Sequence, residues 1–202
     1  MKSKNSVITG NYFNKYKSKN LLYSILVNHY RFALQSLIQD LPIDTCLEIG
    51  SGEGYIIDYI LSTKPGIQIF GSDIGFSVVS LAKTDREFVK WCVSDGKNIP
   101  ITENSFDIVF ACEVLEHIDK PTDVLKEINR VSKKYVIISV PFEPFWRIMN
   151  IMRLKYLSSL GNTPGHINHW SINGITKLVE VYFQPIDIRI SFPWIFIKAQ
   201  KR

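Results

Sequence analysis

Apolar residues along the chain gather in short runs, and between these runs they recur at a helical period. The runs at 43–49, 67–72, 88–93, 106–112 and 135–140 predict buried strands. Between them, the periodic stretches predict helices, one of them over 121–131 with Pro121 in its first turn. Strands that alternate with helices in this way indicate a parallel sheet with crossover helices.

The two ends of the chain complete this pattern. Residues 12–39 predict one or two helices that stop at Asp40-Leu41-Pro42. Their expected buried face consists of Leu22, Ile25, Leu26, His29, Phe32, Ala33, Ser36 and Leu37. Near the other end, the apolar runs 186–191 and 194–199 are too close for a parallel crossover and must form a hairpin. The sequence therefore predicts an α/β fold with a mostly parallel, seven-stranded sheet whose last strand is antiparallel.

Length and composition favour one domain. With 202 residues, 46% of them apolar, the chain can bury one substantial core. We expect a single domain over 1–202, with a helical cap over 1–40 and an insertion over 141–170, where the strand–helix alternation lapses. Pro141 ends the preceding strand, and the next predicted helix starts near Ile172.

The cysteines and the lengths of the apolar runs indicate the cellular compartment of the protein. Cys46, Cys92 and Cys112 each fall in a predicted strand and show no metal-ligand spacing, so they are expected to be small buried hydrophobic residues in a reducing compartment. No metal is predicted. The N-terminus lacks the apolar segment of a signal peptide, and no apolar run reaches membrane-spanning length. A cytoplasmic protein is expected.

Charge is unevenly distributed within the net value of +5. Residues 1–39 carry +6 and residues 141–202 carry +5, whereas residues 40–140 carry −6. Basic segments on both sides of an acidic middle are compatible with an anionic partner or a membrane surface. A solvated lysine-rich surface explains the same pattern equally well.

A glycine-rich turn connects the first predicted strand to the helix that follows. It has the spacing Glu48-x-Gly50-x-Gly52-x-Gly54, so three positions lack a Cβ that could keep a ligand from the backbone. A dinucleotide-binding fingerprint would need its third glycine at position 55, which is Tyr55. This spacing disfavours a nicotinamide-dependent oxidoreductase. Taken alone, the run could still be an ordinary tight turn.

Further acidic residues follow the next strands in order. Asp73 ends the second strand, Asp95-Gly96 follows the third, and the fourth lies in the stretch FDIVFACEVLEHI, which contains Glu113. Together with the glycine run, these motifs resemble those of class I S-adenosylmethionine (SAM) dependent methyltransferases, over most of the chain from about Tyr12 onward. The resemblance implies a Rossmann-like three-layer sandwich, SAM as cofactor, and methyl transfer to an acceptor.

The resemblance also implies roles for individual residues. Gly50 and Gly52, with Gly54 in the same run, are expected at the methionine moiety, and Asp73 at the ribose hydroxyls. The expected adenine contacts are Ile74 on the ring face and Asp95, with Gly96, at the amino group. Glu48 is expected to orient the loop and the ligand's ammonium group, and Glu113 lies at the end of the fourth strand. For each acid, a helix cap or turn is the alternative role.

A general base is needed only if the acceptor loses a proton. The best candidates are His117, after the fourth strand, and His166, in the segment Gly165-His166-Ile167-Asn168-His169-Trp170. Either histidine could instead organise its loop. His29 and Glu143 are weaker candidates.

Residues 145–157 contain a broad apolar surface interrupted by Arg147, Arg153 and Lys155. Such a segment suits a lid or a peripheral membrane contact above an apolar, lipid-linked acceptor, or a helix packed on its own core. Enzymes that methylate base nitrogens typically carry an Asn/Asp-Pro-Pro-aromatic run where this chain has Ala111-Cys112-Glu113-Val114, so a nucleic-acid acceptor is disfavoured. We expect a small-molecule or lipid-linked acceptor. A non-catalytic SAM-binding regulatory or partner subunit is the alternative, and the oligomeric state is not predicted.

Overall fold

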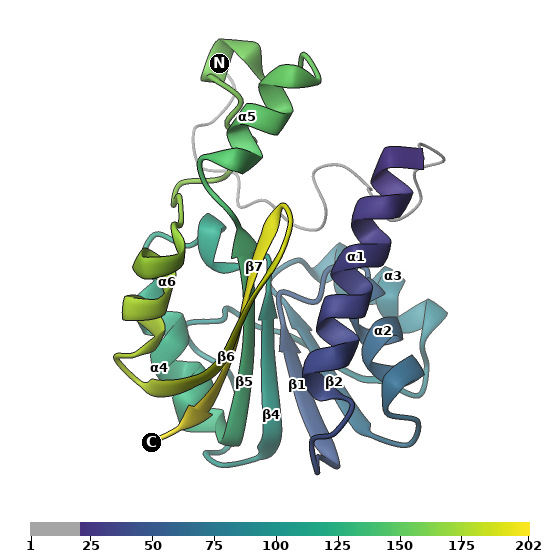
Figure 1. Ribbon diagram of the computed structural model, residues 1–202. Coiled ribbons are helices and arrows are strands. Elements are labelled where there is room, and N and C mark those ends of the chain that lie inside the picture. The colour runs from purple at the N-terminus through teal and green to yellow at the C-terminus, as the bar shows by residue number, and fades with distance from the viewer. Residues whose placement is uncertain (1–20) are drawn as a thin grey trace.

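A seven-stranded sheet forms the centre of the protein in a computed structural model that describes residues 21–202 (Figure 1). The strands are β1 (Thr45–Ile49), β2 (Gln68–Asp73), β3 (Lys90–Val93), β4 (Phe106–Cys112), β5 (Ser132–Pro141), β6 (Phe183–Ser191) and β7 (Trp194–Lys201). They are ordered β3-β2-β1-β4-β5-β7-β6. β1 to β5 are parallel, and β7 runs antiparallel to both β5 and β6. The predicted fold class is confirmed.

The observed strands can be compared with the predicted apolar runs. β4 has the predicted bounds, and β5 starts earlier than predicted because Ser132 pairs with Phe106. Residues of β4 and β5 are buried on both faces, which explains why both appear in the sequence as nearly continuous apolar runs. β6 and β7 form the expected hairpin around Phe192-Pro193.

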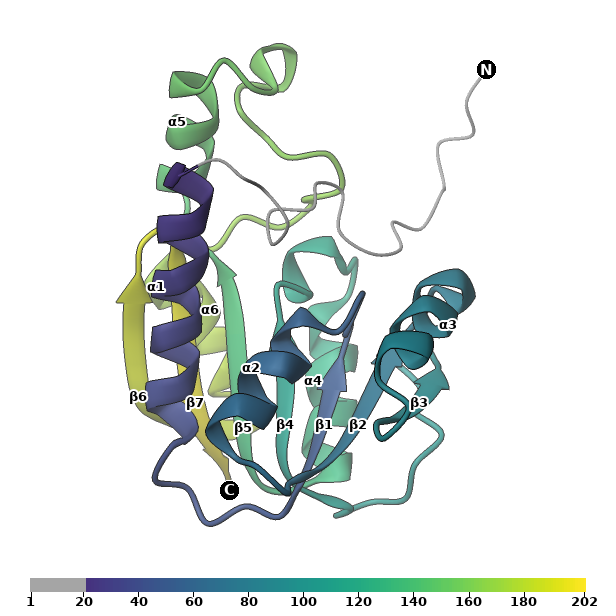
Figure 2. The same cartoon turned by 90° about the vertical axis from the view of Figure 1, so that its right-hand side faces the viewer.

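Helices cover both faces of this sheet. The helices of residues 21–202 are α1 (Leu21–Ile38), α2 (Tyr55–Thr63), α3 (Phe76–Asp85), α4 (Pro121–Val131), α5 (Phe145–Met152) and α6 (Ile172–Val179), with 3₁₀ turns η2 (Leu115–His117) and η3 (Leu157–Ser159), and all of the α-helices except α5 lie against the sheet. α1 and α2 pack into one apolar core with the sheet, and α4 and α6 pack into the other (Figures 1 and 2). α3 is tied to α2 by Arg86, whose Nε donates to Asp58 Oδ1 at 2.7 Å.

The predicted buried face of α1 was partly wrong. Leu37 is buried as expected, but the other fully buried positions are Tyr30, Leu34 and Ile38, whereas Phe32 is 60% exposed. The second half of α1 lies on the sheet, and there the Tyr30 hydroxyl shares a 2.6 Å hydrogen bond with Ser139 Oγ of β5. The apolar period left Tyr30 off the predicted buried face of α1. Its hydroxyl can be buried because it is hydrogen-bonded to Ser139. Residues 12–20 of the predicted helical region lie outside the described residues.

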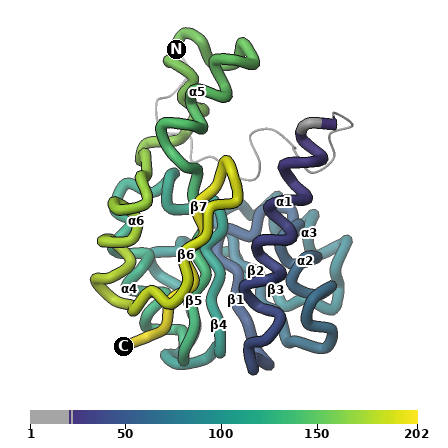
Figure 3. Tube along the Cα trace, viewed as in Figure 1, coloured from purple at the N-terminus to yellow at the C-terminus, as the bar shows by residue number. Residues whose placement is uncertain are grey.

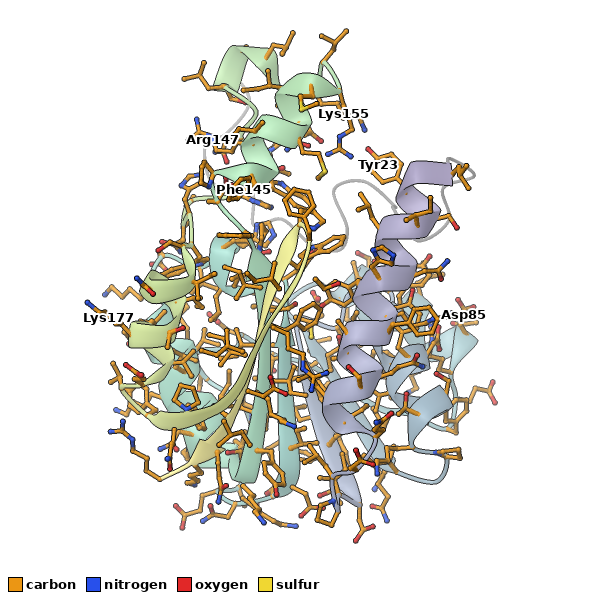
Figure 4. The ribbon with its side chains drawn as sticks, in the orientation of Figure 1. Tyr23, Asp85, Phe145, Arg147, Lys155 and Lys177 are labelled. Carbon is orange, nitrogen blue, oxygen red and sulfur yellow. The ribbon has the colours of Figure 1, made fainter. Side chains whose placement is uncertain are left out.

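The segment between β5 and α6 leaves the sheet at the carboxyl ends of the parallel strands, and α5 projects beyond them (Figures 1 and 3). The start of α1 reaches the same region. Lys155 Nζ donates to the Tyr23 hydroxyl at 2.8 Å, and the Arg153 guanidinium lies 5.3 Å from the centre of the Tyr23 ring (Figure 4). α1 and the α5 segment therefore meet above the edge of the sheet where ligands bind in open α/β folds.

Candidate active site

The glycine loop between β1 and α2 lies at the point where the strand order reverses, because β1 pairs with β2 on one side and β4 on the other. Gly50, Gly52 and Gly54 have φ values of +67°, +51° and +83°, a left-handed conformation that favours glycine. A Cβ on Gly50 would lie 2.5 Å from Cγ2 of Val114, the residue directly before η2. The alternating glycines thus allow a tight loop that contacts the segment following β4.

Asp73 connects this loop to the end of β2. Its side chain is buried, its Oδ2 accepts a hydrogen bond from Gly52 N at 3.0 Å, and its Oδ1 accepts one from Gly75 N at 2.8 Å. Each carboxylate oxygen keeps a further lone pair for another donor. The structure therefore brings together the first and second predicted motifs, which lie more than 20 positions apart in the sequence.

Glu48, in β1, is a buried carboxyl with an open hydrogen-bonding position. Only 1% of the residue is exposed, and its Oε2 has no hydrogen-bond partner among the described residues. Burial, and then repulsion by Asp73, raise the pKa of Glu48 well above its usual value. A cationic ligand group such as an ammonium would supply the missing donor and the missing positive charge. The glycine loop, Asp73 and Glu48 together fit SAM, which carries an ammonium, a carboxylate and two ribose hydroxyls.

The predicted adenine side is more open. Ile74 is 43% exposed directly after Asp73, which leaves its apolar surface available to a ring. Asp95 is partly exposed, and its Oδ1 accepts a hydrogen bond from Lys97 N at 2.9 Å. A Cβ on Gly96 would lie 3.1 Å from Ile49 Cγ2, so this loop packs against the end of β1. Ile74, Asp95 and Gly96 thus all lie at the same edge of the sheet as the glycine loop.

The chain turns sharply after β4. Glu113 has a φ of +58°, which is uncommon for a residue other than glycine, and its N–H donates to Ser139 O of β5 at 2.9 Å. η2 follows directly after this turn, beyond the carboxyl end of β4. Strained backbone of this kind is frequent at functional sites.

η2 and the loop before α6 bring both predicted base candidates together. The rings of His117 and His166 lie 4.9 Å apart between centroids, in an edge-to-face arrangement. One ligand atom each from Glu116, His117 and His166 lies within 4.8 Å of the other two, and no other group of three such side chains with metal-binding spacing occurs between residues 21 and 202. We refer to these three residues as the Glu-His-His cluster.

The remaining histidines and Glu143 lie elsewhere. His169 is exposed, and its Nε2 lies 2.9 Å from Asn162 Oδ1. His29 is exposed on α1 and lines a surface hollow beside Phe32, Arg189 and Phe192. Glu143 follows β5; burial raises its pKa, and its Oε1 has no hydrogen-bond partner within residues 21–202. None of these three residues belongs to the Glu-His-His cluster.

Sequence reasoning missed several residues that shape this region. Glu116 was not singled out, although it is 1% exposed and lies next to His117. Trp146 stacks on His166, with 6.2 Å between ring centroids, and its Nε1 donates to Thr163 Oγ1 at 3.0 Å. Asn150 donates to Gly161 O at 2.9 Å. The only signal in the sequence was the low polarity of residues 145–152, which indicated a helix but not its partner.

Comparison with known proteins agrees with this geometry. A family model described as a methyltransferase domain matches residues 47–139, which run from β1 into β5. Over 88 residues the chain is 30% identical to the malonyl-(acyl-carrier protein) O-methyltransferase of Legionella pneumophila, covering 42% of this chain and 31% of that protein. Over 89 residues it is 28% identical to the ubiquinone/menaquinone biosynthesis C-methyltransferase UbiE of Desulfotalea psychrophila, covering 43% and 36%. The chain thus spans about a third of the length of these relatives.

The fold is shared with solved methyltransferase structures. Magnesium protoporphyrin IX methyltransferase (ChlM) from Synechocystis PCC 6803, solved with bound SAH, superposes with a TM-score of 0.67 at 16% identity. The superposition covers 92% of this chain and 89% of that one. The matched domain and the shared fold support a class I SAM-dependent methyltransferase.

Proposed function

We propose that the protein is a SAM-dependent methyltransferase that acts on a small-molecule or lipid-linked acceptor. The observation that carries this proposal is the arrangement of Glu48, the left-handed glycine loop and Asp73 around one point on the carboxyl edge of the sheet. The match of residues 47–139 to a methyltransferase domain supports it independently.

Bound SAM supplies a methyl group on a sulfonium sulfur, which keeps the electron pair of the broken C–S bond as the acceptor forms its new bond to carbon. The protein's task is to orient both partners and exclude water. In this proposal Glu48 holds the ammonium group, Gly50 and Gly52 approach the methionine moiety, and Asp73 holds the ribose. Ile74, Asp95 and Gly96 bind the adenine, and Glu113 shapes the edge that faces the acceptor.

A binding measurement tests the cofactor assignment. Isothermal titration calorimetry with SAM and with SAH should show saturable binding, and Asp73→Asn should weaken it about tenfold or more, because a neutral amide accepts less strongly from two hydroxyls. Asp85→Ala is the matched control, since Asp85 is an exposed acid at the end of α3 (Figure 4). Wild-type protein that binds neither compound would refute the proposal. Turnover of labelled SAM with a cell extract then separates an enzyme from a non-catalytic SAM-binding subunit.

The acceptor class rests on the α5 segment, residues 145–160. Its exposed apolar side chains lie beyond the sheet edge that carries the predicted cofactor residues: Phe145, Ile148, Ile151, Met152, Leu154, Leu157 and Leu160. The segment contains Arg147, Arg153 and Lys155 and no acid. Among relatives, one bears the name of an enzyme of quinone biosynthesis, and quinones are apolar compounds. We propose that this surface contacts an apolar acceptor or the membrane that holds it.

No helix among residues 21–202 is long and apolar enough to cross a membrane, so this contact would be peripheral. Co-sedimentation with vesicles of phosphatidylcholine and phosphatidylglycerol tests it. The double variant Met152→Gln/Leu154→Gln, which changes side chains that are 80% and 79% exposed, should lose most of the binding. Leu81→Gln/Val181→Gln, both 57% exposed, on α3 and in the turn between α6 and β6, should bind like wild type. Equal binding by all three proteins would count against the membrane contact.

The proposed location is the cytoplasm. Cys46, Cys92 and Cys112 form no disulfide, and Cys46 and Cys112 are buried in strands. This use of cysteine suits a reducing compartment.

A further inference from the structure

We propose that the Glu-His-His cluster binds one divalent transition-metal ion of the Zn²⁺ or Co²⁺ type. One donor atom from each of Glu116, His117 and His166 lies within 4.8 Å of the other two. Donors held at about 2.1 Å from a single ion lie roughly 3–4 Å apart, so side-chain movements on the order of 1 Å would complete the site. Two imidazoles with one carboxylate suit such an ion better than Mg²⁺ or Ca²⁺, which prefer oxygen ligands.

The cluster is buried and comes from two segments about 50 residues apart in the sequence. Glu116 and His166 are 1% and 8% exposed, and His117 is partly exposed. An ion held by Glu116 and His166 would therefore be shielded from water on one side. The partly exposed His117 marks the side from which a further ligand could approach, as an open coordination position requires.

A hydrogen bond at Nδ1 orients the His117 ring for this role. Its Nδ1 lies 3.0 Å from the carbonyl oxygen of Gly165. A carbonyl can only accept, so Nδ1 carries a hydrogen, and in the neutral ring Nε2 is then the nitrogen with the lone pair. A ligating histidine that donates its other ring N–H to a carbonyl is the usual arrangement in protein metal sites.

The loop that carries His166 is fastened to η2. Ile167 N and Asn168 N donate to Glu116 O at 2.9 and 3.1 Å. The Asn168 side chain donates to Leu115 O at 3.0 Å and to Ile118 O at 2.6 Å. With the bond between His117 and Gly165, five hydrogen bonds therefore hold the two ligand-bearing segments together before any ion binds.

The position of the cluster indicates what the ion would do. Val114, directly before η2, is the residue that packs against Gly50 in the glycine loop. The cluster thus lies beside the loop proposed to hold the methionine end of SAM. If the proposed function is correct, the ion would bind an oxygen of the acceptor, which would then be a hydroxyl or carboxyl compound.

Coordination to the ion lowers the pKa of an acceptor hydroxyl, so the proton passes to solvent more readily. The oxygen that remains then forms its bond to the methyl carbon, while the C–S electron pair stays on sulfur. In this scheme His117 and His166 are ligands and neither is the general base.

Metal binding can be tested without SAM or an acceptor. Tag-free protein, stripped with a chelator, is titrated with Zn²⁺ and with Co²⁺ by calorimetry, and we expect one equivalent to bind. His166→Ala and Glu116→Gln should each weaken binding by at least about 10- to 100-fold, which is the usual cost of losing a residue that only supports a ligand. His169→Ala is the matched control, because His169 is an exposed histidine three positions from His166, and it should bind like wild type.

A second measurement needs no variant. In wild-type protein with ¹⁵N-labelled histidine, Zn²⁺ should shift the ring resonances of His117 and His166 and leave those of His29 and His169 in place. Failure to bind either ion, or shifts confined to His29 and His169, would overturn the proposal. So would unchanged affinity in folded His166→Ala and Glu116→Gln proteins.

The outcome is separable from that of the cofactor proposal. His166→Ala should bind SAM with wild-type affinity, because His166 is not among the proposed SAM contacts. Protein that binds metal but not SAM would refute the proposed function and leave the metal site standing. Protein that binds SAM but no metal would refute the metal site and leave the proposed cofactor in place.

Discussion

Two carboxyl groups on neighbouring strands show how differently the two edges of the sheet are built. At the amino edge, Asp107 of β4 accepts hydrogen bonds from Asp44 N, Thr45 N, Thr45 Oγ1 and Lys133 Nζ, all at 2.9 to 3.0 Å. At the carboxyl edge, Glu48 of β1 is buried with an oxygen that has no partner in the described part of the chain. The first carboxyl is fully satisfied by the protein, and the second is not.

Their pKa values move in opposite directions. Partial burial opposes ionisation of Asp107, but hydrogen bonds from Asp44, Lys133 and Thr45 outweigh it and lower the pKa to about 2. Burial, and then Asp73, raise the pKa of Glu48. The amino edge therefore stabilises the fold, while the carboxyl edge keeps an unfavourable carboxyl that a cationic ligand would compensate.

Among the predictions, the largest expected change in the free energy of unfolding comes from replacing a glycine, and it should differ between the two edges of the sheet. Gly50→Ala should destabilise the protein by about 2–4 kcal/mol, because the new Cβ combines a left-handed φ with a clash against Val114. It should also reduce SAM affinity. Gly66, at the amino edge before β2, has a φ of +92°, and a Cβ added there would meet no atom within 4 Å, so Gly66→Ala should cost only about 1–2 kcal/mol.

Urea unfolding and SAM calorimetry on both glycine variants check this. Equal destabilisation by the two substitutions would show that the contact with Val114 adds nothing to the backbone strain.

Asp107→Ala should have the next largest effect and lower the free energy of unfolding by about 1–3 kcal/mol, because three donors at the start of β1 lose their acceptor. Its SAM affinity should not change. The wild-type contribution of Asp107 is fully present above its ordinary pKa near 3.8 and is lost as the pH falls toward 2, because the folded pKa is the lower one. Asp119→Ala removes an exposed acid that pairs only with Lys97 among the described side chains and serves as control. A similar loss in both variants would contradict the special role of the amino edge.

Glu48→Gln should have the smallest effect on stability, and unlike the other variants it should stabilise the protein. A carboxyl whose folded pKa is raised stabilises the fold least when it is ionised, so its contribution falls as the pH rises above the ordinary value of 4.5. The variant lacks this dependence and should gain about 1 kcal/mol relative to wild type between pH 5 and pH 8, while SAM binding weakens.

Thermal melts of the ligand-free proteins across that pH range, with and without SAM, measure both effects. A variant that is uniformly less stable than wild type at every pH would show that Glu48 is a structural acid.

Local pattern predicted much of the fold. The bounds of β4 and α4 followed from one apolar run and one amphipathic stretch that begins with proline. The hairpin of β6 and β7 followed from the short loop between two apolar runs. The face of α1 was predicted less well, because the contact between Tyr30 and Ser139 joins residues 109 positions apart.

The candidate site also has a part that local sequence predicted and a part that it did not. Glu48, the glycines and Asp73 lie at strand ends, and a parallel sheet must bring such ends to one edge. Their roles at SAM remain predictions that the binding experiments test. The pairing of η2 with the His166 loop has no local signal, since it depends on hydrogen bonds between segments some 50 residues apart.

The sequence by itself determined the sheet, the edge at which a ligand is expected and the tight glycine loop, because strand length, helical period and left-handed backbone are local properties of the chain. Only the tertiary structure decided which carboxyl is satisfied and which is not, and that Glu116, His117 and His166 meet. Those properties depend on burial and on contacts between distant segments, which no short stretch of residues encodes.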